Sequence, residues 1–239
     1  FDKFVEALAP EQRSKVCLLM HTTPVEEHGT DLPRTIAECC SPETNVVFAP
    51  NRYSEEQLNY LYNIGDVTIN VASNEGFGLA TAESIMAGTP IIVNVTGGIQ
   101  DQCGFLFQNE EVGGNWDYTR PSDYIKWGTL HDWRLWKDKL KWGDWVTPVW
   151  STSRSFTGSV PTPYIFEDHI DYVEVADSIR YWYDMSRDDR KAKGLLGRDF
   201  ALGVGGLSVQ NMCQTLINGM DGAFKNWKSR KKYELFKIK

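Results

Sequence analysis

The sequence lacks the features of a membrane-spanning or secreted protein. No apolar run approaches the roughly 18 residues that a helix needs to cross a bilayer. The first residues form an amphipathic stretch rather than the basic and then apolar segment of a secretory signal. The chain opens on Phe1 instead of Met, so we expect a fragment or a processed piece of a longer protein. We expect its location to be cytoplasmic.

Metal-ligand spacing and excess positive charge are also missing. The five cysteines make an odd number and show no paired zinc spacing, which favours reduced, buried thiols. A net charge of −7 argues against nucleic acid as the main partner. The whole sequence is 41% hydrophobic and 24% charged, as in ordinary soluble proteins. Its 239 residues suffice for one large domain or two small ones.

Short apolar runs alternate with helical patterns over the first hundred residues. Continuous apolar runs of strand length are typical of parallel strands that are buried on both faces. We therefore expect an α/β fold, with an open parallel sheet doubly wound by helices and a ligand outside the carboxyl ends of its strands. The expected strands are residues 16–20, 45–49, 66–71 and 90–95.

Helix signals lie between these strands. Asp31 is a plausible cap, and residues 54–57 form a capping box. We expect Pro10 to end a first helix over residues 1–9 and a fourth helix to cover residues 79–87. The expected core face of the helix after the capping box consists of Leu58, Leu61, Tyr62 and Ile64.

Tryptophan is concentrated after this alternating region. Seven of the nine tryptophans lie between Asn109 and Val160. A disordered linker would be poor in aromatic residues, so we expect an ordered insertion with a small core of its own. The alternatives are an acceptor platform that stacks on sugars and an oligomer contact. Further helices are expected near residues 171–185, 187–200 and 208–224, followed by a basic tail.

The chemistry is concentrated in residues 71–90, where an expected strand ends and a helix begins. Gly76 and Gly78 lack side chains, so a ligand can approach the backbone closely. The helix start offers unpaired N–H groups and the positive end of its dipole, which suit a diphosphate. Glu83, about one turn into the helix, can accept hydrogen bonds from a vicinal diol such as ribose. Glu75 would face the other end of the ligand, and a diphosphate between two polyhydroxyl ends is a nucleotide sugar.

This stretch resembles the signature of the family 4 retaining glycosyltransferases of the GT-B fold. The resemblance covers about residues 1–107 and resumes at about 164–220. It rests on Glu75-Gly76-Phe77-Gly78-Leu79, Glu83, Met86 to Ile92 and Gly97-Gly98. It implies that Glu75 is the catalytic residue on the donor sugar, and that Glu83 binds the ribose. The other donor-binding residues that it implies are Gly76, Phe77, Gly78 and Leu79 at the diphosphate, and Phe48, Ala49, Asn51 and Arg52 in the loop that holds the base.

The resemblance also implies an organisation and a reaction. Residues 1–107 and 164–224 would be a Rossmann-like donor-binding domain, the C-terminal half of a GT-B fold. Residues 108–163 would be a Trp-rich insertion, of a kind similar to those in virus- or phage-like members. Residues 225–239 would be a basic tail: a solvated helix, a helix that crosses to the missing domain, or a peripheral contact with anionic lipid. The acceptor-side N-terminal domain and two phosphate-binding cations would precede Phe1.

The implied reaction transfers a hexose from a GDP- or UDP-linked sugar to a glycan or lipid-linked acceptor. The anomeric configuration would be retained, and neither a metal nor a cofactor would be needed, because the helix dipole and cations stabilise the departing diphosphate. The alternative is a non-catalytic module that binds a nucleotide sugar or glycan as an assembly or regulatory element.

Several of these residues also have a simpler, purely structural interpretation. The turn could be an ordinary strand–turn–helix with surface acids. A dinucleotide oxidoreductase is disfavoured because a third glycine is missing and Asn94 stands where an acid would be wanted. His21 follows a strand, where a structural histidine is the simpler interpretation. His28 with Glu26 and Glu27 lacks a third metal ligand, which favours a solvated loop.

Overall fold

The centre of the protein is a buried parallel sheet. The computed structural model describes residues 1–27, 29–108, 116–118, 139–229 and 237. The central sheet has the order β3–β4–β8, and both pairs of neighbours are parallel. All four residues of β4 are buried, as expected of an apolar run that is covered on both faces. The three strands are β3 (Thr68–Asn70), β4 (Ile91–Asn94) and β8 (Val146–Val149).

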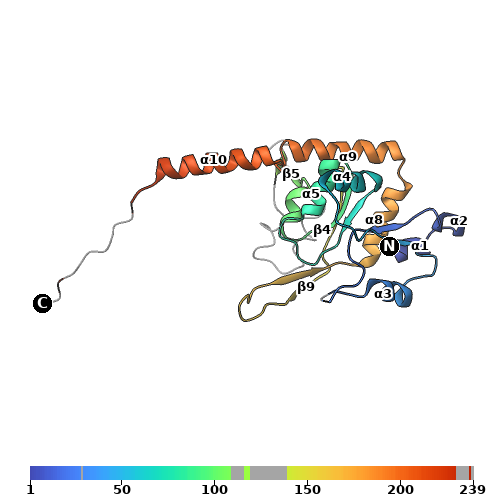
Figure 1. Ribbon diagram of the computed structural model, residues 1–239. Helices are drawn as coiled ribbons and strands as arrows, with labels where there is room; N and C mark the ends of the chain where they lie inside the picture. Colours follow the sequence, from blue (N-terminus) through green and yellow to red (C-terminus); the bar gives the residue numbers. More distant parts are fainter. Residues whose placement is uncertain (28, 109–115, 119–138, 230–236, 238–239) are drawn as a thin grey trace.

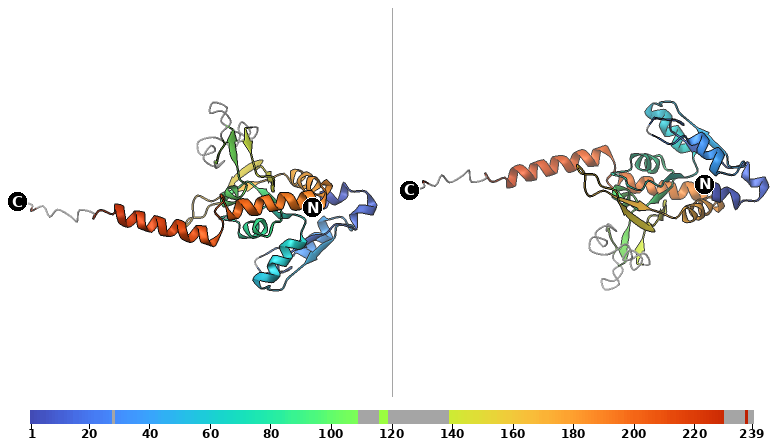
Figure 2. Two further views of the ribbon diagram at one scale, coloured as in Figure 1. Left: turned by 90° about the horizontal axis from the view of Figure 1, so that it is seen from above. Right: turned by 90° about the horizontal axis from the view of Figure 1, so that it is seen from below.

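The parallel sheet that we expected as one unit is divided in two. β1 (Leu18–Met20) and β2 (Val46–Phe48) form a separate parallel pair, which shares no hydrogen-bonded ladder with β3 in the described chain. The helices α3 (Leu32–Cys39) and α4 (Glu55–Ile64) that follow these strands contain no fully buried residue. Figure 2 shows this N-terminal part to one side of α9 (Arg187–Leu202) in both views. The fold is α/β with parallel strands, as predicted, but the first two strands lie beside the core.

The helix starts follow the predicted capping signals. Ser54 Oγ accepts from the N–H of Gln57, and the Gln57 side chain accepts from the N–H of Ser54, which is the expected capping box. Asp31 accepts from the N–H of Arg34 at the start of α3. These side chains satisfy N–H groups that have no partner within the helix.

Three local expectations are wrong. Pro10 begins α2 (Pro10–Arg13) instead of ending α1 (Asp2–Glu6), because the fixed φ of proline suits the first position of a helix. Ile64, expected in the core, is 70% exposed at the last position of α4. The cysteines were expected to be buried, but Cys103 is the one buried cysteine among the five. Cys40 is half-buried, and Cys17, Cys39 and Cys213 are exposed. All five are free thiols, as expected.

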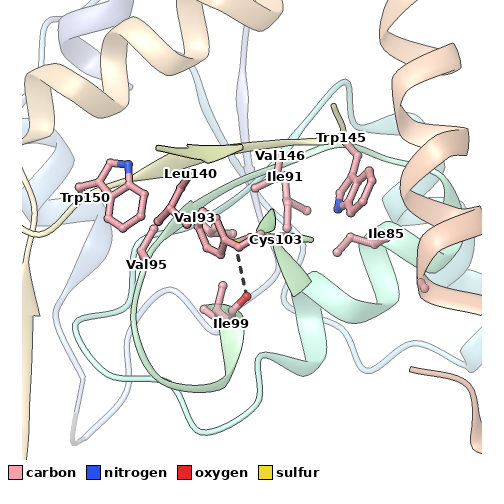
Figure 3. Packing of buried hydrophobic residues seen from close by; sticks show 12 residues of the cluster. Ile85, Ile91, Val93, Val95, Ile99, Cys103, Leu140, Trp145, Val146 and Trp150 are labelled. Carbon is pink, nitrogen blue, oxygen red and sulfur yellow. Dashed lines mark hydrogen bonds between the residues drawn. The ribbon is translucent and has the colours of Figure 1, made fainter. Parts of the chain in front are cut away.

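The main core packs around β4, β8 and α5 (Leu79–Ala87), whose bounds match the predicted helix. Figure 3 shows Trp145 beside Ile85 at one end of this core and Trp150 beside Val95 at the other. Both tryptophans come from the Trp-rich segment, and so does β8. In its described part, this segment therefore completes the central sheet instead of forming a core of its own. Trp127, Trp133 and Trp136 lie outside the described residues, and the domain boundaries stay a prediction.

A second buried cluster covers the other side of the sheet. α8 (Tyr172–Asp184) packs against α1 and β8, and its buried apolar residues are Val175, Ala176, Ile179 and Trp182. The indole N–H of Trp182 donates to Thr147 Oγ1 of β8 at 2.9 Å. This cluster joins the N-terminal helix to the central sheet.

Two smaller antiparallel sheets and a long helix complete the structure. One sheet has the order β6–β5–β7, and β9 pairs with β10. Their bounds are β5 (Leu106–Gln108), β6 (Trp116–Tyr118), β7 (Leu140–Lys141), β9 (Ser153–Phe156) and β10 (Phe166–His169). In Figure 1, α10 (Val209–Asn226) extends away from the body. Most of the basic tail lies outside the described residues, so a membrane contact there stays a prediction.

None of the helices in the described chain is both long and apolar enough to cross a membrane.

Candidate active site

The turn between β3 and α5 holds the first group of predicted site residues. Gly78 caps α5 with a φ of 83°, in the left-handed region that glycine adopts without strain. Its N–H donates to Glu75 Oε1 at 3.2 Å. Leu79, the first residue of α5, is 68% exposed, and Phe77 is exposed too. The first turn of α5, whose N–H groups have no partner within the helix, is therefore accessible near the Glu75 carboxylate.

The 3₁₀ helix η1 (Gly97–Gln102) packs its backbone directly on this turn. The Gly98 N–H donates to the carbonyl oxygen of Glu75 at 3.0 Å. A Cβ atom on Gly97 would lie 1.9 Å from that oxygen, and one on Gly98 would lie 2.2 Å from the Gly76 oxygen, so only glycine fits at both positions. A Cβ atom on Gly76 would meet nothing within 4 Å. The turn is thus closed on the side of η1 and open at Gly76.

Gln102 holds the same turn from the interior, although no motif in the sequence marks it as a site residue. Its buried side-chain Nε2 donates to the carbonyl oxygens of Phe77 at 2.5 Å and Gly78 at 3.0 Å. The indole N–H of Trp145 donates to the backbone oxygen of Gln102 at 3.0 Å. The sequence offers one indication of this role: Gln102 directly precedes the apolar residues 103–106. A glutamine buried with such a run needs hydrogen-bond partners for its side-chain amide.

Glu83 lies in the second turn of α5 and hydrogen bonds with a residue of α4. The hydroxyl of Tyr62 donates to Glu83 Oε2 at 2.9 Å. Burial raises the pKa of Tyr62, and the acceptor carboxylate raises it further, so Tyr62 stays a donor at neutral pH. We expected Tyr62 in the core face of α4. It is half-buried there, and its hydroxyl forms the hydrogen bond to Glu83. The sequence could have indicated this contact, because the hydroxyl of a buried tyrosine usually has a hydrogen-bond partner.

The predicted base loop follows β2. Phe48 is the last residue of β2, and the next residue, Ala49, is buried. His21 Nδ1 lies 2.8 Å from the carbonyl oxygen of Ala49 and donates to it, which ties the ends of β1 and β2 together. Asn51 and Arg52 are exposed. Across the described residues, no hydrogen bond or ion pair joins this loop to the turn after β3.

The β9–β10 hairpin is anchored at the carboxyl end of β4, beside the segment that leads into the turn after β3. Buried Asp168 forms an ion pair with Arg154, with Nε 2.6 Å from Oδ1, and accepts from Thr96 Oγ1 at 2.8 Å. Its N–H donates to the carbonyl oxygen of Ser73 at 2.7 Å. Asn94, at the end of β4, donates to the backbone oxygen of Asp168 at 2.8 Å. These contacts hold the hairpin against the segment that leads into the turn.

Metal-ligating side chains do not gather in the described chain. Within residues that the structure describes, no three His, Cys, Asp or Glu side chains form a group that could hold a metal ion. His28, considered with Glu26 and Glu27, lies outside those residues. His21 contacts the Ala49 backbone, which agrees with a structural role.

The region that carries this site is similar to known glycosyltransferases. Residues 2–117 match the family model described as family 4 glycosyltransferase in conflict systems. An uncharacterised glycosyltransferase of Methanocaldococcus jannaschii is 35% identical over 81 residues, which are 33% of this chain and 20% of that relative. The chain thus spans about a fifth of the length of the curated relative that it matches. The part of the chain that holds the turn after β3, Gln102 and Glu83 is accordingly similar to family 4 glycosyltransferases.

Proposed function

We propose that this chain is the donor-binding part of a glycosyltransferase that uses a nucleotide-diphosphate sugar. One observation carries the proposal: the open turn from Glu75 to Gly78 runs into the accessible start of α5, with Glu83 on the same helix. The similarity of residues 2–117 to family 4 glycosyltransferases supports the same function. The donor would be linked to GDP or UDP.

The diphosphate would lie against the backbone of Gly76 to Gly78 and the first turn of α5. The open space at Gly76 allows a phosphate oxygen to approach the main chain. The N–H groups and the dipole of α5 favour negative charge at this end. These groups would stabilise the departing diphosphate without a bound metal, together with cations from another part of the enzyme.

The two glutamates would hold the two ends of the donor. Among the described residues, Gly78 is the hydrogen-bond partner of the Glu75 side chain, through Oε1, which leaves Oε2 to accept from a hydroxyl of the sugar. Glu83 would accept from the ribose hydroxyls, and Phe48, Ala49, Asn51 and Arg52 would lie near the base. Transfer of a hexose would retain the anomeric configuration, and the acceptor would be a glycan or a lipid-linked sugar. An acceptor-side domain would complete the enzyme.

Calorimetric titration with UDP and with GDP tests the donor site. We expect weak binding of at least one nucleotide to this chain, and an affinity lower by at least about tenfold in Glu83→Ala, since hydrogen bonds to charged groups contribute about 1.5–3 kcal/mol. Glu55→Ala removes an exposed glutamate from the first turn of α4 and should leave binding unchanged. Absence of heat with both nucleotides at millimolar concentration would refute the proposal.

A further inference from the structure

Tyr62 is connected to the α5 region at both its side chain and its backbone. Its hydroxyl donates to Glu83 Oε2 at 2.9 Å. Its carbonyl oxygen accepts from Thr89 Oγ1, in the connection from α5 to β4, at 2.8 Å, and from the N–H of Gly65 at 3.2 Å. The last turn of α4 is therefore tied to α5 through Glu83 and to the connection after α5 through Thr89. A small displacement of α4 relative to α5 would change both contacts.

The hydrogen bond from Tyr62 restricts the Glu83 carboxylate without occupying all of its acceptors. An ionised carboxylate has two oxygens with about four lone-pair sites, and Tyr62 uses one of them on Oε2. A free glutamate side chain samples several rotamers, and a ligand that needs one of them must restrict it on binding. A half-buried tyrosine that already holds the carboxylate reduces this cost in advance.

The environment keeps Tyr62 in the donor form. Burial is the larger cause of its raised pKa, and the neighbouring Glu83 carboxylate adds to it, since a phenolate there would face a negative charge. Tyr62 therefore remains protonated, and so a donor, at neutral pH.

We infer that Tyr62 is a positioning residue, which fixes the Glu83 carboxylate for a vicinal diol of the ligand, the ribose of a nucleoside diphosphate. This inference rests on the proposed function. It predicts that Tyr62 contributes to affinity through the ribose hydroxyls, the 2′-hydroxyl among them, and not through the base or the phosphates. Tyr62 itself need not touch the ligand.

The test compares Tyr62→Phe with wild type in calorimetric titrations with UDP, GDP and their 2′-deoxy forms. We expect wild type to bind the ribonucleotide more tightly than the deoxynucleotide. Tyr62→Phe should lower affinity for the ribonucleotide by about five- to tenfold, less than the loss of a whole hydrogen bond to a charged group because Glu83 itself is kept. It should lower affinity for the deoxy form by a smaller factor, because that form offers Glu83 the 3′-hydroxyl alone. Glu83→Gln should remove the same discrimination, and the double variant should lose little more than Glu83→Gln alone.

A matched control lies two residues away on the same helix. Tyr60 donates to Glu56 at 2.8 Å, and Tyr60 is exposed. Tyr60→Phe makes the same chemical change and should alter neither affinity. Thermal unfolding of each variant shows whether the fold is retained.

The outcomes separate this inference from the proposed function. If wild type binds neither nucleotide, the proposed function fails. If wild type prefers the ribonucleotide and Glu83→Gln removes the preference, but Tyr62→Phe keeps it, the role of Tyr62 is refuted while the donor site stands. Equal weakening of both nucleotides by Tyr62→Phe, together with a lower Tm, would also overturn it, because a merely structural role predicts that result.

Discussion

The side-chain amide of Gln102 donates a 3.0 Å hydrogen bond to the carbonyl oxygen of Gly78, the residue that caps α5. The same amide donates to Phe77 at 2.5 Å. A buried side chain of η1 thus holds the backbone of the proposed diphosphate turn, and Trp145 holds the backbone of Gln102 in place. The backbone of the turn is thus held on its inner side, while Gly76 faces open space.

Replacing Gln102 with methionine should therefore weaken both the fold and the site. The length of the side chain is kept, but the carbonyl oxygen of Phe77 loses a donor, and we expect a loss of about 1–3 kcal/mol in the free energy of unfolding. Urea denaturation measures this loss. Gln214→Met on the exposed face of α10 serves as the control and should change stability little. Equal stability of the two variants would contradict the supporting role of Gln102.

The two glycines of the turn should respond differently to alanine. At Gly78, a Cβ atom would lie 2.7 Å from Thr81 Oγ1 and 2.8 Å from Ile99 Cγ1, and φ is +83°. Gly78→Ala should cost about 2 kcal/mol or more of stability, from the left-handed backbone and the overpacking together. Gly76→Ala meets open space, so its Tm should stay near that of wild type while its affinity for UDP or GDP falls. Thermal unfolding and calorimetry on both variants check this contrast, and a stable Gly78→Ala would contradict it.

The helices and strands near the site could be predicted from the sequence, because the residues that determine each of them are close together in the chain. Residues 79–87 have a glycine at each end, and α5 begins and ends there. The apolar run at residues 90–95 contains β4. The capping box at Ser54 depends on residues three positions apart. In each case the residues that determine the element are neighbours in the chain.

The partners across the fold were not accessible from the sequence. β8 pairs with β4 from 55 residues further along the chain, within a segment that has no sustained period. Tyr62 fits an apolar helix face by pattern, and its contact with Glu83 follows only from the packing of α4 on α5. The separation of the β1–β2 pair from the sheet that contains β3 also arises from tertiary packing. Short apolar runs predict strands, but they do not predict which strands pair with each other.

Removing the charge of Asp168 should loosen the β9–β10 hairpin. Asp168→Asn leaves Arg154 without its ion-pair partner at a buried site, and we expect a loss of about 2–4 kcal/mol, below the largest values because the Arg154 side chain is 34% exposed. The exposed pair between Arg180 and Asp184 provides the control, and Asp184→Asn should change stability little, because solvent screens an exposed ion pair.

Urea denaturation and limited proteolysis measure the two effects. Cleavage between β9 and β10 should be faster in Asp168→Asn than in Asp184→Asn, because the hairpin is held to Ser73 and Thr96 by the backbone and side chain of Asp168. Equal stability and equal cleavage would show that the ion pair does not anchor the hairpin.

Stability should fall in alkaline solution because of Cys103. Burial raises the pKa of its thiol above the ordinary value of 9.0, so the folded state keeps a proton that the unfolded state releases. The contribution of the thiol is fully present below pH 9 and is lost as the pH rises, by up to about 1.4 kcal/mol per pH unit. Urea denaturation from pH 7 to about pH 10.5 should show a shallower decline for Cys103→Ala than for wild type. Cys213→Ala, which removes an exposed thiol, should keep the wild-type slope, and identical slopes for all three proteins would refute the assignment.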